Sequence, residues 1–512
     1  MDKQYSIKVG AKAFLLAFLI ILALMIVSGV LTRVVPAGAY ERTEMDGRVI
    51  VVPGSYEEIA RPDYPIWRWA TAPAEVLFAP GNIAVITIIL FLIFVGGAFT
   101  ILEQGGILEE GLRFLVARLG ARRYLLMAII ILAFMLLAAV LGIYEAMVPL
   151  IVFIVPLAHI LGWDSMVGLG MSLLPLAFGF SAAITNPFTI GVAQTIAELP
   201  LFSGAWLRAI FFVLVYALVL LFVRRYAKRI ERNPLASPVY EEDEPLRARY
   251  RTAAGLGEVA PPDGGSAERE PNVASDATPD REPPAAGRPL APPMRRALLW
   301  FGASMGLAIV FVLVTSRNPV LSDVAFPLMA LLLFIGGVGS GLLAGMRSAR
   351  IARTFGRGVL NIAPGIVLIL MSMSVKHIVE SGGIMDTLLY RASELIEGSP
   401  PLVAAFLVYA VTLVMNFFIG SASAKAFLMM PILTPLADLV GITRQTAVLA
   451  FGFGDGFSNM IYPSNALLII ALGFTVVSYP RWLRWTIGLQ AIIFALSMLF
   501  LAFAALTGFG PF

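Results

Sequence analysis

The segments Leu176–Asn186 (LAFGFSAAITN) and Leu449–Asn459 (LAFGFGDGFSN) share an LAFGF opening and end on a hydroxyl residue followed by Asn. Two further pairs of segments precede them in the same order. PLAHILG at 156–162 matches PLADLVG at 435–441, and ILEQGGI at 101–107 matches IVESGGI at 378–384. Because three matches keep the same order, the chain contains a duplicated unit of roughly a hundred residues.

The composition indicates a membrane protein. Apolar residues make up 59% of the chain and Asp, Glu, Lys and Arg only 14%, whereas globular chains carry about 45–50% and about 25%. Several apolar runs, among them 13–31, 83–99, 209–223 and 297–314, approach the ~20 residues that cross a ~30 Å hydrocarbon core. An internal duplication in such a protein is typical of transporters.

The chain lacks the residues and motifs that enzymes and ATP-driven pumps require. The chain has no Cys, so disulfides, thiolate metal ligands and a Cys nucleophile are excluded. It has two His and contains no HExxH, GxSxG or Walker motif. We therefore expect neither an enzyme nor an ATP-driven pump, and no nucleic-acid partner.

The basic residues predict the topology. Lys3, Lys8 and Lys12 precede the first apolar run, which is longer than the ~7–15 apolar residues of a signal peptide. It is therefore interpreted as a retained helix whose N-terminus lies inside. Residues 36–80 then form an external loop, in which VIVV at 49–52 predicts a strand.

The second copy of the repeat predicts an inversion. Segment 381–397 matches 104–120 but has lost its excess of arginine, so it should lie outside, whereas the arginines of 104–120 should lie inside. The helices that precede these segments, 82–104 and 359–378, therefore run in opposite directions. This is the inverted topology of many secondary carriers.

Two apolar stretches are interrupted at their centres. Stretch 124–161 is broken at Gly142–Glu145, and stretch 401–439 at Gly420–Lys425. Half-length arms fit re-entrant hairpins, since irregular backbone at membrane depth is tolerated only inside protein or along a cavity. Nine crossings then place every basic cluster inside: 13–31, 82–104, 165–195, 204–224, 296–315, 320–345, 359–378, 444–474 and 485–506.

The predicted fold is an all-α polytopic membrane protein with inverted repeats, about nine transmembrane helices, two re-entrant hairpins and two broken helices. Residues 1–232 form an N-terminal half with the first repeat, and 295–512 a C-terminal half with the inverted second repeat. Residues 233–294, rich in Pro, Gly, Ala and charge, are expected to form a disordered cytoplasmic linker. The N-terminus is expected inside and the C-terminus outside.

The chemistry is expected where the repeated helices break, near 182–187 and 454–459. A helix unwound in the membrane exposes carbonyls to a cation and directs positive helix ends at anions. Polar side chains at the breaks are Thr185, Asn186, Ser458 and Asn459. The alternative is that small and hydroxyl residues there only pack helices together.

Three charged residues lie at the predicted membrane depth: Glu145 at the first hairpin tip, Lys425 just past the second, and Asp455 in a broken helix. An ionisable group inside the membrane is a functional hypothesis by default, because its burial costs a few kcal/mol. Lys425 could meet a substrate carboxylate. The structural alternative is a salt bridge of Lys425 with Asp455 or Glu145.

Several runs resemble a known family. TNPFTIGVAQ at 185–194, SAKAFLMMPILTPLAD at 423–438 and QTAVLAFGFGDGFSN at 445–459 are similar to the four-carbon dicarboxylate anaerobic carrier family, in its YfcC-like branch, within the ion transporter superfamily. The resemblance implies an elevator-type secondary carrier that is a homodimer in the bacterial cytoplasmic membrane. Its transport domain would consist of the hairpins and broken helices.

The resemblance also implies site residues. Its helix-break motifs imply Thr185, Asn186, Ser458 and Asn459 as substrate ligands, to which the intramembrane charges add Glu145, Lys425 and Asp455. The coupling cation would be bound by Asn186, Ser458, Asn459 and Asn465. The first hairpin tip, Gly142–Glu145, departs from the polar pattern of the family. The coupling ion is sodium or a proton, with no other cofactor.

The expected substrate is a small organic carboxylate, either a dicarboxylate or an amino acid. Glu145 and Asp455 against a single Lys425 leave the site formally acidic, which suits an amino group as well as a carboxylate. Uptake of an organic anion ranks slightly ahead of basic amino-acid exchange of the arginine/ornithine type. A channel is the other alternative, but it needs a continuous polar pore in place of breaks at the midplane.

Overall fold

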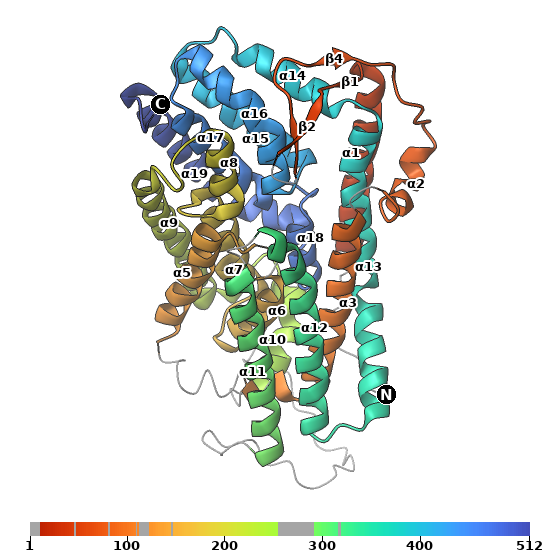
Figure 1. Ribbon diagram of the computed structural model, residues 1–512. Helices are drawn as coiled ribbons and strands as arrows, with labels where there is room; N and C mark the ends of the chain where they lie inside the picture. The colour runs from red at the N-terminus through yellow and green to blue at the C-terminus, as the bar shows by residue number, and fades with distance from the viewer. Residues whose placement is uncertain are drawn as a thin grey trace, which may run out of the picture.

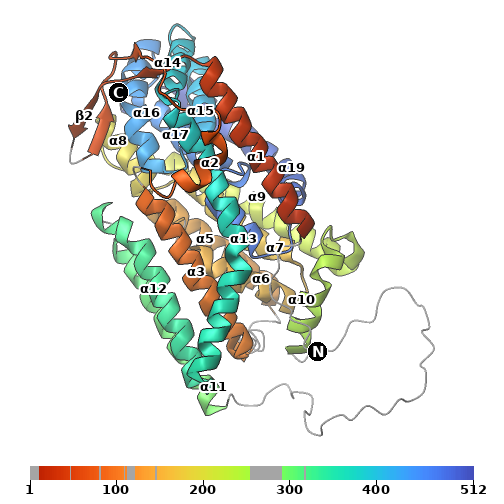
Figure 2. The same ribbon diagram turned by 90° about the vertical axis from the view of Figure 1, so that its right-hand side faces the viewer.

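The protein is almost entirely helical. The computed structural model describes residues 11–45, 48–79, 82–108, 110–111, 122–144, 147–253, 291–315 and 319–511. Long helices run along the molecule, and the few short strands gather at one end of it (Figures 1 and 2). The predicted all-α class is confirmed.

Nine helices among the described residues are long and apolar enough to cross a membrane. They are α1 (Ala11–Val34), α3 (Asn82–Gln104), α5 (Arg123–Leu141), α7 (Ser165–Ala182) continued by η3 (Pro187–Gly191) and α8 (Val192–Ile196), α9 (Ala205–Arg232), α13 (Ser348–Ser381), α15 (Pro401–Phe418), α16 (Ala422–Val440) and α19 (Tyr479–Thr507). The number equals the predicted one, but the members differ. Three of them, α5, α15 and α16, are hairpin arms. Three predicted crossings are not in this set: α11 (Pro292–Thr315), α12 (Pro319–Leu343) and the broken helix of α17 (Arg444–Phe457) and α18 (Ala466–Gly473).

The long helices fall into two groups by their contacts. Helices α1, α3, α11, α12 and α13 pack on one another, and we call them the scaffold group. Helices α5 to α9 and α15 to α19 also pack on one another, and we call them the site group. The site group includes α6 (Val148–Ile160), α17 (Arg444–Phe457), η5 (Ser458–Met460) and α18 (Ala466–Gly473).

Both predicted hairpins are present as pairs of helices joined by a short break. Helix α5 ends at Leu141, where Gly142 adopts a φ of 68° that favours glycine. In the second hairpin the break is shorter than predicted, because Ser421 caps α16 and Lys425 already lies in its first turn. The open ends face opposite ends of the molecule, since α6 contacts α10 while α15 contacts α14 (Figure 1).

The repeated LAFGF helices cross each other at the centre of the site group. Ser181 Oγ of α7 donates to the Phe453 carbonyl of α17 at 2.9 Å. At Gly456 a Cβ would lie only 2.1 Å from the Ser181 backbone nitrogen, so this crossing requires glycine. The later parts of the broken helices then contact the hairpin of the other repeat, α8 against α16 and α18 against α6.

A polar layer covers one end. It contains α2 (Arg68–Glu75), α14 (Met385–Ile396) and two short antiparallel strand pairs: β1 (Gly38–Ala39) with β4 (Glu57–Glu58), and β2 (Arg42–Met45) with β3 (Arg48–Val51). Strand β3 confirms the strand predicted at 49–52. The layer is tied to α14 by a salt bridge from Arg42 to Asp386 at 2.9 Å.

The opposite end corrects the prediction of a disordered linker. Residues 234–253, which the sequence places in the linker, form η4 (Pro234–Ala236) and α10 (Tyr240–Ala253), and α10 packs on α6. Val239, Asp243 and Tyr250 are buried at spacings of four and seven residues, which gives the segment an inward-facing stripe. Residues 254–290 lie outside the described residues.

Candidate functional site

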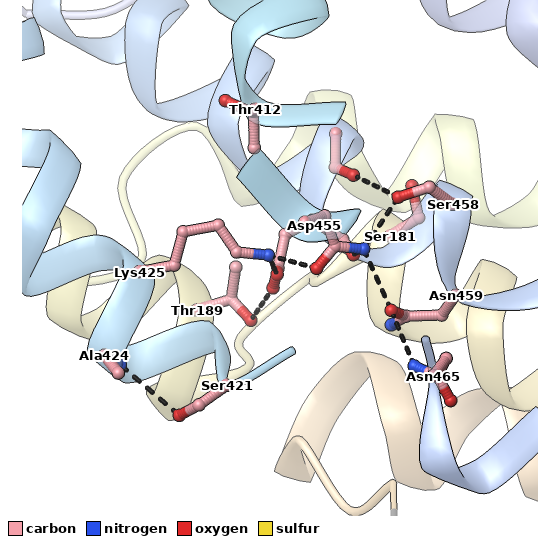
Figure 3. A network of polar contacts seen from close by, with 12 residues as sticks. Ser181, Thr189, Thr412, Ser421, Ala424, Lys425, Asp455, Ser458, Asn459 and Asn465 are labelled. Carbon is pink, nitrogen blue, oxygen red and sulfur yellow. Dashed lines mark hydrogen bonds and ion pairs between the residues drawn. The ribbon is translucent and has the colours of Figure 1, made fainter. Parts of the chain in front are cut away.

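A buried ion pair lies where the second hairpin meets the second broken helix. Lys425 Nζ is 2.5 Å from Asp455 Oδ1, and the same ammonium donates to Asn416 Oδ1 of α15. Figure 3 shows the Lys425 side chain extending from α16 toward Asp455. The two charged side chains are 0% and 1% exposed. The structural alternative considered from the sequence, a salt bridge between these residues, is therefore present.

The other oxygen of the same carboxylate faces the first repeat. Thr189 Oγ1 donates to Asp455 Oδ2 at 3.2 Å (Figure 3). The same hydroxyl accepts from Asn186 Nδ2 at 3.1 Å. Thr189 lies in η3, a π-helical turn directly after the first break. Such turns occur frequently at functional sites. The carboxylate thus joins both repeats.

Three oxygens converge on one amide at the second break. Asn416 Nδ2 lies 2.9 Å from the Asp455 carbonyl, 2.7 Å from Ser458 Oγ and 2.9 Å from Asn459 Oδ1. Asn465 Nδ2 donates to Asn459 Oδ1 as well, at 3.0 Å. Hydroxyl, carbonyl and amide oxygens are the ligands that hard cations prefer.

The helix ends at the breaks are capped by side chains of the same residues. Asn186 Oδ1 accepts from the backbone nitrogens of Phe188 and Thr189 at 2.9 and 3.2 Å. Asn465 Oδ1 accepts from Leu468 N at 3.2 Å at the start of α18. Because these caps already satisfy the first amides, the site residues also hold the broken helices in shape.

The first break is fixed to the first hairpin by a separate set of contacts. Thr185 donates from its backbone nitrogen to the Ala139 carbonyl and from Oγ1 to the Val140 carbonyl, both at 3.1 Å. The buried Arg208 of α9 donates from Nη2 to the Ile184 carbonyl at 3.0 Å. Ala183 has a φ of 42°, which is strained for a residue with a side chain.

The structure brings most, but not all, of the predicted site residues together. Lys425, Asp455, Ser458, Asn459, Asn465 and Asn186 form one connected network with Asn416 and Thr189. Thr185 lies at the first break but bonds to α5. Glu145 lies outside the described residues.

Sequence reasoning missed two members of the network. Thr189 stands inside the quoted run TNPFT, four residues after Thr185, but was not singled out. Asn416 is a single amide in the apolar arm LVMNFF, nine residues before Lys425. A polar residue at membrane depth is costly unless paired, and that cost was the signal available for Asn416.

A fold of hairpins and broken helices around a buried polar network is typical of secondary transporters. The sequence profile of the C4-dicarboxylate anaerobic carrier family matches residues 14–256 and 300–506. The chain belongs to this family of transporters and is a multi-pass membrane protein.

Two relatives align along most of the chain. The protein described as putative basic amino acid antiporter YfcC of Escherichia coli strain K12 is 30% identical over 520 residues, which cover 96% of each chain. An uncharacterized protein of Haemophilus influenzae is 24% identical over 436 residues, which cover 85% of this chain and 78% of that protein.

Two solved structures align over nearly the full length. The YdaH transporter of Alcanivorax borkumensis is 17% identical with a TM-score of 0.39, and the alignment covers 98% of this chain and 99% of that one. MtrF of Neisseria gonorrhoeae, described as an antimetabolite efflux pump, is 15% identical with a TM-score of 0.39, covering 96% and 95%. No residue role is transferred from these structures.

Proposed function

We propose that this chain is a secondary active transporter that binds a small amino acid between Lys425 and Asp455 and carries it across the membrane by an elevator movement of the site group. The observation that carries the proposal is the buried ion pair at the junction of the two repeats. It is supported by family membership and by the position of the pair next to both helix breaks.

The substrate class follows from the charges of the pair. If a dicarboxylate displaced Asp455 from Lys425, Asp455 and the second carboxylate of the substrate would both lack a counter-ion, and an uncompensated buried charge is strongly destabilising. An amino acid brings one carboxylate for Lys425 and one ammonium for Asp455, so both buried charges stay compensated. The name of the relative from E. coli agrees with this choice. On this argument we rank an amino acid ahead of a dicarboxylate, which is the reverse of the ranking based on sequence.

A dicarboxylate remains the second candidate, because the family is named for such substrates. A basic amino acid exchanged for another is a narrower form of the first candidate. It carries one further positive charge, for which Glu145 is the sequence-based partner. A panel of substrates separates these classes directly.

The position of the polar network around Lys425 and Asp455 within the site group supports the elevator mechanism. Every member of the network belongs to the site group, so the group could move together with a bound substrate. The scaffold group contacts it through few polar bonds, one of which runs from Ser372 Oγ of α13 to the Pro463 carbonyl at 2.9 Å. Phe153 of α6 also packs against Phe99 and Phe301 of the scaffold group.

Sodium is the proposed coupling ion. The Asp455 carbonyl, Ser458 Oγ and Asn459 Oδ1 would coordinate it once the Asn416 amide turns away. Proton coupling through Asp455 or Glu145 is the rival mechanism. We further propose a homodimer in the bacterial cytoplasmic membrane, with the N-terminus inside and the C-terminus outside.

Counterflow in proteoliposomes tests the proposal. Vesicles loaded with unlabelled lysine, arginine, alanine, succinate or fumarate are diluted into a trace of the same labelled compound. Saturable accumulation with the amino acids and none with the dicarboxylates is the expected result. Accumulation with succinate alone contradicts the substrate class but keeps the transporter. A non-saturable flux without counterflow indicates a channel and overturns the proposal.

A further inference from the structure

A groove with one cationic and one apolar end lies between α9 and α19. It has a volume of about 810 Å³ and is lined by Arg225 and Arg229 of α9, Arg481 and Arg484 of α19, and apolar side chains of both helices. The two helices lie in contact, and both views show them side by side (Figures 1 and 2). None of these residues belongs to the network around Lys425.

The groove follows one face of each helix. On α9 the lining residues are Leu218, Leu221, Phe222, Arg225, Tyr226 and Arg229, a spacing of three and four residues. On α19 they are Arg481, Arg484, Trp485, Leu489 and Ile492. The Trp485 ring lies 4.7 Å from that of Phe222 and 5.0 Å from that of Tyr226, so the arginines of the two helices lie at the same level.

Most of the positive charge in the groove has no partner among the described residues. Arg481 forms a salt bridge with Glu242 of α10 at 2.5 Å. No ion pair within the described part of the chain involves Arg225, Arg229 or Arg484, and all three are exposed. Four cations against one carboxylate give the groove a large excess of positive charge, which fits an anionic ligand.

The apolar end is open and has the depth of one leaflet. Leu221 is 49% exposed and Ile492 53% exposed, although both lie on helices long and apolar enough to span a membrane. From Arg229 to Leu218 the α9 face extends about 16 Å at 1.5 Å per residue. Half of a ~30 Å hydrocarbon core is about the same length. The groove therefore matches a headgroup with the acyl chains below it.

We infer that this groove binds an anionic glycerophospholipid, with a preference for one that carries two phosphates. The phosphates contact Arg225, Arg229 and Arg484, and the acyl chains lie along the leucine and isoleucine side chains of α9 and α19. Arginine suits this role because its planar fork binds phosphate oxygens in pairs. Basic pockets between transmembrane helices are known to hold such headgroups.

The inference is tested on the delipidated, purified full chain in detergent, by native mass spectrometry and by the rise in melting temperature. The probes are cardiolipin, phosphatidylglycerol, phosphatidylethanolamine and sodium phosphate at matched phosphate concentration. Cardiolipin should bind most tightly and phosphatidylethanolamine most weakly, and sodium phosphate should have no effect. Stabilisation by phosphate alone identifies a free-anion site and overturns the inference.

Variants locate the binding. Arg225→Gln/Arg229→Gln/Arg484→Gln should weaken cardiolipin binding about 100-fold, which corresponds to about 1 kcal/mol for each arginine. Arg350→Gln/Arg353→Gln, two exposed arginines of α13 away from the groove, should leave binding unchanged. Should the triple variant be unstable, Arg484→Gln alone should weaken binding about fivefold. Equal binding by the groove variants and the control variant contradicts the inference.

Discussion

Thr189 of the first repeat donates a hydrogen bond to Asp455 of the second, with 3.2 Å between Oγ1 and Oδ2. The other oxygen of this carboxylate, Oδ1, accepts a hydrogen bond from the Lys425 ammonium. One side chain therefore holds both helix breaks and the second hairpin together. In the proposed function, the carboxylate and ammonium of a bound amino acid replace the contact between Lys425 and Asp455. Substrate binding is therefore coupled to the local structure of both helix breaks.

The elevator movement predicts that linking the two helix groups stops transport. The rings of Phe153 and Phe301 lie 5.3 Å apart across the boundary between the groups. Phe153→Cys/Phe301→Cys, joined by a short bifunctional thiol reagent, should lose uptake, and cleavage of the link should restore it. The control is Phe94→Cys/Phe334→Cys, a pair with rings 5.1 Å apart within the scaffold group, which should transport normally. Full uptake by the first linked pair contradicts a movement between the groups.

Sodium coupling predicts that uptake depends on sodium at fixed pH. Asn459→Ala removes one of the three oxygens that converge on Asn416, and it should raise the sodium concentration for half-maximal uptake roughly tenfold or more. Asn233→Ala, at an exposed residue outside the network, should not. Uptake that instead follows a pH gradient in sodium-free buffer and is lost in Glu145→Gln supports proton coupling. Uptake that depends on neither sodium nor a pH gradient indicates obligate exchange of one substrate for another.

The proposed orientation predicts which end of the protein reacts from outside the cell. Helices α14 and α10 lie at opposite ends of the molecule (Figure 1). Because the chain has no native Cys, single cysteines at the exposed Glu394 and Glu244 report on each end separately. An impermeant thiol reagent should label Glu394→Cys in intact cells and Glu244→Cys only after permeabilisation. The reverse pattern inverts the topology.

The contribution of Asp243 to the docking of α10 should weaken as pH rises, whereas burial lowers the pKa of the neighbouring His159 to about 4, so His159 acts in the opposite direction. Asp243 accepts from Ser165 N at 2.7 Å and Oγ at 2.5 Å, and it lies 3.6 Å from His159. Burial raises the pKa of Asp243 to about 6. Because this pKa lies above that of an exposed Asp, the docked state binds protons more tightly. The contribution of this proton to docking is full below pH ~4 and is lost as pH rises through 6, about 3 kcal/mol in total.

A spin label at Glu244→Cys measures this docking. In His159→Gln, which removes the opposing imidazole, the label should be more mobile at pH 7.5 than at pH 5, and adding Asp243→Asn should reduce this difference. Burial raises the pKa of Asp164 as well, and Asp164 is held by Tyr226 and Ser237. The residual pH dependence of Asp243→Asn therefore reports on Asp164. Equal mobility of the label at both pH values in the His159→Gln background excludes the role of Asp243.

Much of the architecture was predictable from the sequence because duplicated motifs and basic clusters are strong signals. The LAFGF pair indicated the two helices, α7 and α17, that end at the breaks, and intramembrane charge singled out Lys425 and Asp455. Helix α10 was missed because its polar composition, with Pro245 inside it, resembles a linker. Three buried positions, Val239, Asp243 and Tyr250, are a weaker sequence signal for a helix than this composition is for a linker. Asn416 was missed because one amide in an apolar arm forms no pattern.

The buried pair of Lys425 and Asp455 predicts that a variant lacking both charges stays folded but does not transport. Lys425→Met leaves the buried carboxylate of Asp455 without a counter-ion and should destabilise the fold by about 3–5 kcal/mol. Lys425→Met/Asp455→Asn removes both charges with little change in volume, so most of that stability should return. The exposed pair Lys376 and Glu380, 3.3 Å apart on α13, provides the control Lys376→Met/Glu380→Gln, which should change neither property.

The most direct measurement is therefore amino-acid uptake by the folded double variant Lys425→Met/Asp455→Asn in proteoliposomes. If Lys425 and Asp455 bind the carboxylate and the ammonium of the substrate, this variant should melt close to the wild-type temperature and show no counterflow. The control variant should transport at the wild-type rate. Wild-type counterflow by Lys425→Met/Asp455→Asn would show that the pair is only a structural salt bridge and that the substrate binds elsewhere.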